Sequence, residues 1–203
     1  MAILVTGGAG YIGSHMVLAL VERGEEVVVL DNLSTGMWWA IPPEARLVEG
    51  DIGDEALLDR VMVQYGFDAV VHFAGSIVVP DSVADPLGYY LNNTVKSRAL
   101  MAAAVAGGVK NFIFSSTAAV YGNPLSMPVF ESERPTPISP YGTSKLMTEL
   151  MLPGMTPLRK VRSPYRPLQR SRSCAGEAPS RSRGGAPPGE SIWVEEEDIA
   201  GRP

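Results

Sequence analysis

The chain has 203 residues, of which 45% are hydrophobic, with 22 acidic and 17 basic side chains. This length allows one domain, or one domain and part of a second, and the apolar share suffices for a buried core. No uninterrupted run of about 18 apolar residues occurs, so the pattern excludes a membrane-spanning helix. A single cysteine, Cys174, excludes an internal disulfide and a cysteine-rich metal site, which favours a reducing, cytoplasmic setting.

Charge and composition change along the chain. Residues 1–150 hold 8 basic and 16 acidic side chains, whereas residues 151–203 hold 9 basic and 6 acidic ones. The acidic first part argues against nucleic acid as its partner. We therefore expect one domain over residues 1–152 and a segment of different character over residues 153–203.

The first 152 residues alternate between two apolar patterns. Continuous apolar runs, typical of strands buried on both faces, occur at residues 2–6, 26–31, 45–51, 68–75 and 111–116. Helical patterns lie between them, at residues 11–24, 54–66 and 85–108. In the first helix one face carries Ile12, Met16, Ala19 and Leu20. The alternation predicts an α/β fold with a doubly wound, Rossmann-like parallel sheet, incomplete at its C-terminal end.

Glycines after the first strand predict a dinucleotide site. Gly7, Gly10 and Gly13 have the spacing G-x-x-G-x-x-G between a strand and a helix. Gly7 suits the tight turn, Gly10 lets the backbone approach a pyrophosphate, and Gly13 lets helix and strand pack closely. Asp31 ends the second strand, where a carboxylate suits the ribose hydroxyls and repels a 2′-phosphate, so NAD is favoured over NADP. The alternative is a structural glycine turn beside a solvated aspartate.

Two further strand ends are candidates for the same site, because ligands of such sheets bind at the carboxyl ends of the strands. Asp51 and Ile52 suit the adenine, the first by a hydrogen bond and the second by apolar contact. The backbone near the nicotinamide ribose is expected from Phe73, Ala74 and Gly75. Aspartate and glycine are also ordinary turn residues, so both interpretations stay open. His72 is expected to be a core histidine, not a metal ligand.

A serine–threonine strand end and a tyrosine–lysine pair predict proton transfer. Ser115, Ser116 and Thr117 end one strand, and Tyr141 precedes Lys145 by four residues. On a helix these two share a face, and the ammonium favours the phenolate of a phenol whose pKa is ordinarily about 10. Tyr141 could then act as a base near neutral pH, with Thr117 holding the substrate oxygen. An isolated pair of this kind would be an ordinary helix face; its order after a dinucleotide site favours catalysis.

Seven motifs follow one another over residues 1 to about 150: TGGAGYIGSH, LDNLS, GDI, HFAG, NNT, SSTAAVYG and SPYGTSK. With them the chain resembles the extended short-chain dehydrogenase/reductase family, and within it the sugar-nucleotide epimerases. The resemblance implies tightly held NAD, a UDP-hexose substrate, and isomerase activity that interconverts UDP-glucose and UDP-galactose by transient oxidation at the sugar C4. It implies Tyr141 as the base, partnered by Thr117. It also implies cofactor contacts by Gly7, Gly10, Tyr11, Ile12, Gly13, Asp31, Asn32, Asp51, Ile52, Phe73, Ala74, Gly75, Asn93, Ser115, Tyr141 and Lys145.

Several functional alternatives stay open beside this resemblance. Ala118 and Ala119 stand where related dehydratases carry acids, which disfavours dehydration. Epimerases of UDP-glucuronate or of N-acetylated UDP-hexoses are alternatives, as is a non-catalytic NAD-binding fragment. The resemblance implies a homodimer that pairs through two helices, one over residues 85–105 and one beginning at Tyr141. Pro153 shortens the second helix, which argues against such pairing.

Residues 153–203 break the pattern. They are rich in Arg, Pro, Ser and Gly without a sustained period, so we expect an irregular, disordered tail. Its basic run could bind nucleic acid, although Tyr165 is the one aromatic side chain between Arg159 and Arg183. A shifted reading frame of an epimerase gene is a further hypothesis. On either view the family's substrate domain has no counterpart in these residues, and we expect little turnover.

Overall fold

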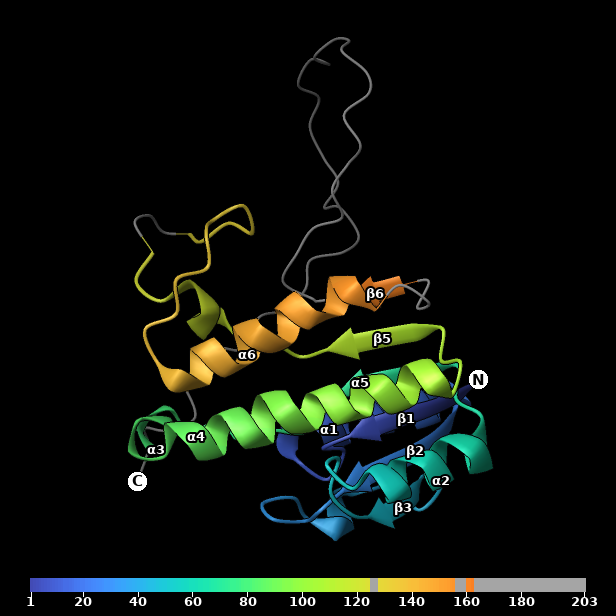
Figure 1. Ribbon diagram of the computed structural model, residues 1–203. Coiled ribbons are helices and arrows are strands. Elements are labelled where there is room, and N and C mark those ends of the chain that lie inside the picture. The colour runs from blue at the N-terminus through green and yellow to red at the C-terminus, as the bar shows by residue number, and fades with distance from the viewer. Residues whose placement is uncertain (125–127, 156–159, 163–203) are drawn as a thin grey trace, which may run out of the picture. The chain divides into compact units, whose positions relative to one another are not determined.

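The computed structural model describes residues 1–124, 128–155 and 160–162, all of which belong to one compact unit. Most of the predicted tail therefore lies outside the described residues, together with the expectations of disorder and nucleic-acid binding attached to it. Within the described residues, no helix combines the length and apolar character needed to cross a membrane. Figure 1 shows strands and helices alternating along the chain.

Among the described residues, six strands form one sheet in the order β3-β2-β1-β4-β5-β6, and every neighbouring pair is parallel. The strands span Ala2–Thr6 (β1), Glu26–Asp31 (β2), Arg46–Glu49 (β3), Ala69–His72 (β4), Asn111–Phe114 (β5) and Lys160–Arg162 (β6). This order confirms the predicted doubly wound α/β fold. The direction of strand addition reverses between β1 and β4, so a ligand is expected at the carboxyl ends of these two strands.

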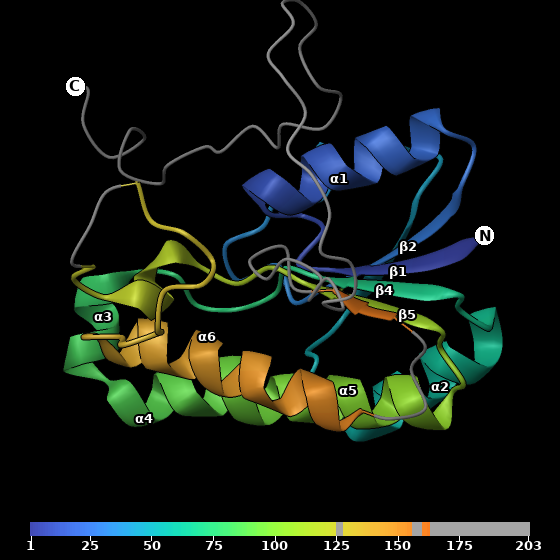
Figure 2. The same cartoon turned by 90° about the horizontal axis from the view of Figure 1, so that it is seen from above.

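Helices cover both faces of the sheet. They span Tyr11–Glu22 (α1), Glu55–Tyr65 (α2), Val79–Ala84 (α3), Pro86–Tyr89 (α4), Lys96–Ala106 (α5) and Pro140–Met151 (α6). A π-helical turn, η2 (Tyr90–Val95), joins α4 to α5, and short 3-10 turns span Trp38–Ala40 (η1), Ala118–Tyr121 (η3) and Leu152–Gly154 (η4). Figure 2 shows α1 on one face of the sheet and α2, α5 and α6 on the other.

Alternating residues of the strands pack into two separate hydrophobic cores, one on each face of the sheet. Leu4 faces the core under α2 and α5, whereas Val5 faces the core under α1. The predicted apolar face of α1 is not the face that packs on the sheet: Gly13 and Val17 are buried, but Ile12 is 53% exposed. Because α1 is apolar on nearly every side, its periodicity does not single out the face that packs.

Strand β6 differs from the expectation of an irregular segment after residue 152. Lys160–Arg162 pair in parallel with Asn111–Ile113 at the edge of β5. A three-residue strand is too short to display a period of two. The partners for its backbone hydrogen bonds come from β5, about 50 residues earlier in the chain, so no local pattern predicts it.

Candidate active site

The turn between β1 and α1 contains two glycines that the fold requires, Gly7 and Gly13, and one that it does not, Gly10. Gly7 has a φ of +71°, and a Cβ there would lie 2.6 Å from the backbone nitrogen of Ala74. A Cβ on Gly13 would overlap the carbonyl oxygen of Gly7. A Cβ on Gly10 would meet the oxygen of Gly7 at 3.3 Å and no other atom within 4 Å. Protein packing therefore leaves the space beside Gly10 open.

The N-terminus of α1 is suited to an anion. Gly10 is the N-cap of α1 and provides no side-chain hydrogen bond, whereas the Asp54 carboxylate caps α2 and the Ser139 hydroxyl caps α6. Tyr11 and Ile12 begin the helix and are exposed, as expected of residues beside a bound ligand. The amides of a first helical turn lack partners within the helix and carry partial positive charge, so they favour a phosphate group.

Asp31 joins the glycine turn to the loop that follows β2. Its side chain is buried, and its two carboxylate oxygens accept hydrogen bonds from the backbone amides of Ala9 and Leu33, each at 2.9 Å. Each oxygen keeps a further lone pair for another donor. The carboxylate thus lies beside the phosphate turn, where the predicted contact with a ribose would require it.

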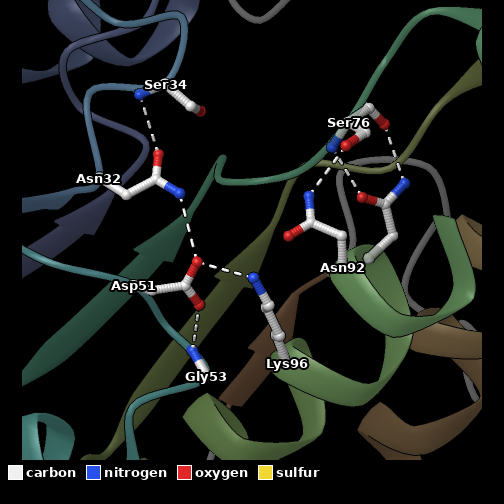
Figure 3. A network of polar contacts seen from close by, with 8 residues as sticks. Asn32, Ser34, Asp51, Gly53, Ser76, Asn92 and Lys96 are labelled. Atoms are coloured by element: carbon white, nitrogen blue, oxygen red, sulfur yellow. Dashed lines mark hydrogen bonds and ion pairs between the residues drawn. The ribbon is translucent and has the colours of Figure 1, made fainter. Parts of the chain in front are cut away.

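Asp51 lies in a polar network beyond the end of β3, which Figure 3 shows. One carboxylate oxygen accepts from the Gly53 amide at 2.7 Å; the other accepts from Lys96 Nζ at 2.7 Å and from Asn32 Nδ2 at 3.2 Å. Partial burial raises the pKa of Asp51, but the hydrogen bonds from Lys96 and Gly53 outweigh it and leave the pKa below its ordinary value. Ile52 is buried in the core under α2 and α5.

The loop after β4 is held by Asn93, from the π-helical turn. Phe73 and Ala74 both donate backbone hydrogen bonds to the Thr6 carbonyl, at 2.9 and 3.1 Å. The Asn93 side chain accepts from the Ser76 amide at 2.7 Å and donates to the Ser76 carbonyl at 2.8 Å. It also donates to Ser144 Oγ at 3.0 Å. A side chain predicted to contact the cofactor thus fixes the loop that contains Gly75 and ties it to α6.

Helix α6 buries the predicted tyrosine–lysine pair. Tyr141 is 2% exposed and Lys145 is 4% exposed. Lys145 Nζ donates to the Ser115 carbonyl at 3.1 Å and lies 5.0 Å from the ring centroid of Phe114, so its ammonium is at the end of β5. A buried ammonium at this point creates a strong local positive potential in a region of low dielectric.

Close backbone packing brings Thr117 toward α6. A Cβ on Gly142 would lie 2.6 Å from the carbonyl oxygen of Ala119, so glycine is required beside Tyr141. Thr117 is buried, and its Oγ1 accepts from the Ala119 amide at 3.2 Å, which leaves the hydroxyl hydrogen to be donated. The preceding residue, Ser116, donates a hydrogen bond to Glu149 of α6. The predicted catalytic residues therefore come from two segments that pack directly together.

His72 is a core histidine, as predicted. Its Nδ1 lies 2.6 Å from Thr6 Oγ1, and its Nε2 lies 2.8 Å from Ser97 Oγ. Ser97 Oγ donates to the Asn93 carbonyl at 2.6 Å, so the Nε2–H of His72 donates to Ser97 and the Nδ1 accepts from Thr6. Complete burial, and then the charge of Lys145, lower the pKa of His72 to about 3.

Two residues of the site are missing from the sequence prediction. Lys96 bonds the predicted adenine residue Asp51, and Gly142 permits the approach of α6 to the segment of Thr117. The only local signal for Lys96 is a cation on a largely apolar helix. Gly142 carries the cost of a glycine within a helix, which hints at a close backbone contact.

The strand order, the glycine turn after β1 and the buried tyrosine–lysine pair together define a Rossmann-type domain of the dehydrogenase/reductase class. Residues 3–158 match the NAD dependent epimerase/dehydratase family, and the chain belongs to that family. The particular relatives are sugar-nucleotide epimerases. A UDP-glucose 4-epimerase from Azospirillum brasilense is 58% identical over 150 residues, which cover 74% of this chain and 43% of that protein.

Solved structures give the same result. UDP-glucose 4-epimerase from Brucella ovis, in complex with NAD, has a TM-score of 0.76 and 44% identity, covering 80% of this chain and 50% of that chain. The enzyme from Thermotoga maritima, with UDP-glucose, has a TM-score of 0.76 and 40% identity, covering 80% and 53%. The chain thus spans about half the length of the relatives it matches.

Proposed function

We propose that this chain binds NAD along the carboxyl edge of its sheet and carries the catalytic groups of a UDP-glucose 4-epimerase. The observation that carries the proposal is helix α6, which buries Tyr141 and Lys145, holds the Lys145 ammonium at the end of β5 and packs closely against the segment of Thr117. The fit of NAD rests on Gly10. Protein packing does not require a glycine at this position, and the absence of a side chain leaves the start of α1 open to a pyrophosphate.

The remaining cofactor contacts follow the order of the strands. In this proposal the adenine lies at Asp51 and Ile52, beside Asn32, and its ribose bonds Asp31. The pyrophosphate meets the backbone of Gly10, Tyr11 and Ile12. The nicotinamide half lies at the ends of β4 and β5, against Phe73, Ala74, Gly75 and Ser115, within reach of Tyr141 and Lys145. Asn93 acts there by holding the loop of Gly75 in place.

The protein residues supply proton transfer and orientation. NAD, if held by the residues named above, would supply reversible hydride transfer at the sugar C4. Tyr141 removes the proton from the sugar O4 and returns it at the end of the cycle. The Lys145 ammonium favours the phenolate needed for this step. The Thr117 hydroxyl donates a hydrogen bond to the reacting oxygen and keeps it within reach of Tyr141.

We propose UDP-glucose and UDP-galactose as the substrate pair because the relatives that cover the site are UDP-glucose 4-epimerases at 40% to 58% identity.

A turnover assay tests the function. Interconversion of UDP-galactose and UDP-glucose is measured with excess NAD, with UDP-glucuronate and UDP-N-acetylglucosamine run in parallel. Tyr141→Phe should lower the rate by about 10²- to 10⁴-fold, because it removes the general base. Thr117→Val should lower it by about tenfold or more, whereas Thr117→Ser should retain most of it. Equal rates for Tyr141→Phe and wild type would contradict the assignment, and preference for another UDP-sugar would replace the substrate.

A further inference from the structure

The ion pair between Asp51 and Lys96 joins two distant parts of the chain at the adenine end of the proposed site. Asp51 follows β3, and Lys96 is the first residue of α5, 45 positions later. Lys96 Nζ lies 2.7 Å from Asp51 Oδ2, and the two side chains are 26% and 34% exposed. Figure 3 shows Asn32 above the carboxylate, Lys96 beside it and Gly53 below it; Lys96 and Asn32 bond the same carboxylate oxygen and Gly53 bonds the other.

The backbone next to the pair is shaped to receive the lysine. A Cβ on Gly53 would lie 2.9 Å from Lys96 Cγ and 3.0 Å from Asp51 Oδ1. The stem of Lys96 therefore rests on Gly53, and a side chain at this position would displace either the stem or the carboxylate. Three donors from three segments hold the carboxylate in one orientation. An exposed lysine without such packing would gain little from the pair.

We propose that Lys96 is a positioning residue for cofactor specificity, which holds the Asp51 carboxylate oriented to accept the exocyclic amino group of adenine. The inference rests on the proposed function, which puts the adenine of NAD at Asp51. An ionised carboxylate is an acceptor only. Adenine offers it an amino donor, whereas hypoxanthine and guanine carry a carbonyl oxygen at the same ring position, which the carboxylate repels. Lys96 thereby favours NAD over dinucleotides with a 6-oxo purine.

The surroundings of the pair define how the contact depends on pH. Lys96, Asp51 and Gly53 border a hollow of about 420 Å³, which is also lined by Asp54 and Glu55 from the start of α2 and by Arg98 from α5. Among these charged side chains, Asp54 and Glu55 are negative and Arg98 is positive, but Lys96 is the one that hydrogen-bonds the Asp51 carboxylate. Lys96 is the cation in hydrogen-bond contact, and its loss raises the pKa of Asp51. As the pH is lowered, the Asp51 carboxylate of a chain without Lys96 should therefore take up a proton, and lose affinity for adenine, at a higher pH than in wild type.

Calorimetric titration of the full chain tests the inference, using NAD and nicotinamide hypoxanthine dinucleotide over about pH 4.5 to 8. In Lys96→Met we expect the Kd for NAD to rise about tenfold and that for the hypoxanthine analogue to change less than about threefold. We also expect the acid limit of NAD binding, the pH below which the affinity for NAD falls, to move to higher pH. Lys96→Arg should restore both properties. Arg98→Met removes an equal charge from the same hollow without breaking the pair, and should behave as wild type.

Gly53→Ala provides a second perturbation, because it displaces the stem of Lys96 and keeps its charge. It should shift the same ratio of affinities in the same direction. Wild-type selectivity and an unmoved acid limit in both Lys96→Met and Gly53→Ala would overturn the inference, as would an equal loss for both dinucleotides. If wild-type protein binds no NAD, the proposed function itself fails, and the inference fails with it.

Discussion

The buried histidine makes the stability of this domain depend on pH in a defined direction. His72 is fully buried, donates through Nε2 to Ser97 and accepts at Nδ1 from Thr6. Burial and the charge of Lys145 lower its pKa to about 3 in the folded chain, whereas an unfolded chain has the ordinary value of about 6.5. The unfolded state therefore takes up a proton first as the pH falls. The stability is fully present above about pH 6.5 and is lost below it.

The magnitude follows from the two pKa values. Between them the free energy of unfolding falls by about 1.4 kcal/mol per pH unit from this residue alone. Over the interval from about pH 7.5 to about pH 5.5 the loss is about 1.4 kcal/mol, because its first half lies above the unfolded pKa. His72→Gln does not titrate in this range. At neutral pH it should be less stable by about 2–3 kcal/mol, because it disturbs buried hydrogen bonds and ring contacts with Phe112 and Phe114.

The assay is urea unfolding of wild type and His72→Gln, followed by tryptophan fluorescence and far-UV circular dichroism. Carboxylates titrate alike in both proteins, so the difference between them isolates the histidine. The difference in the free energy of unfolding should narrow by about 1.4 kcal/mol from about pH 7.5 to about pH 5.5. A difference that stays constant over this interval would refute the depressed pKa of His72 and the buried neutral network built on it.

Three further predictions concern residues with separate roles. Gly13→Ala should lose more than about 3 kcal/mol of stability in thermal melting, because its Cβ overlaps the Gly7 carbonyl. Gly10→Ala should stay within about 1 kcal/mol of the wild-type stability, yet calorimetry should show that it binds NAD at least about tenfold more weakly. Asp31→Asn should weaken NAD binding and reduce the ratio of the affinity for NAD to that for NADP in competition titrations. An unchanged ratio would exclude Asp31 from the ribose site. Asp54→Ala should cost about 1 kcal/mol in urea unfolding by removing the cap of α2, and Asp54→Asn should cost less.

Local patterns predicted the parts of this molecule that depend on neighbouring residues. The five strands before residue 120 and the position of the glycine turn follow from apolar runs and glycine spacing, and all are confirmed. The face of α1 was predicted wrongly because its residues are apolar around nearly the whole helix, so that Gly13 and Val17 do not stand out as the contact. Size, not hydrophobicity, decided which face could approach the Gly7 carbonyl.

Pairings between distant segments could not be predicted in the same way. Lys96 and Asp51 meet across 45 positions, and Asn93 reaches Ser144 across 51. Nothing in either short stretch identifies its partner. The π-helical turn at Tyr90–Val95 likewise lies within an unbroken helical pattern. π-helical turns often occur at functional sites, and this one carries the asparagine that holds the loop after β4.

Reduction of bound cofactor in a single turnover tests the central claim most directly. Chain loaded with NAD is mixed with UDP-galactose or UDP-glucose, and the absorbance and fluorescence of reduced nicotinamide are followed. The account predicts that the reduced signal forms in wild type and forms at least about 10²-fold more slowly in Tyr141→Phe at equal NAD occupancy. A reduced signal that forms equally fast in both proteins, or NAD-loaded wild type that forms none with either sugar, would contradict it.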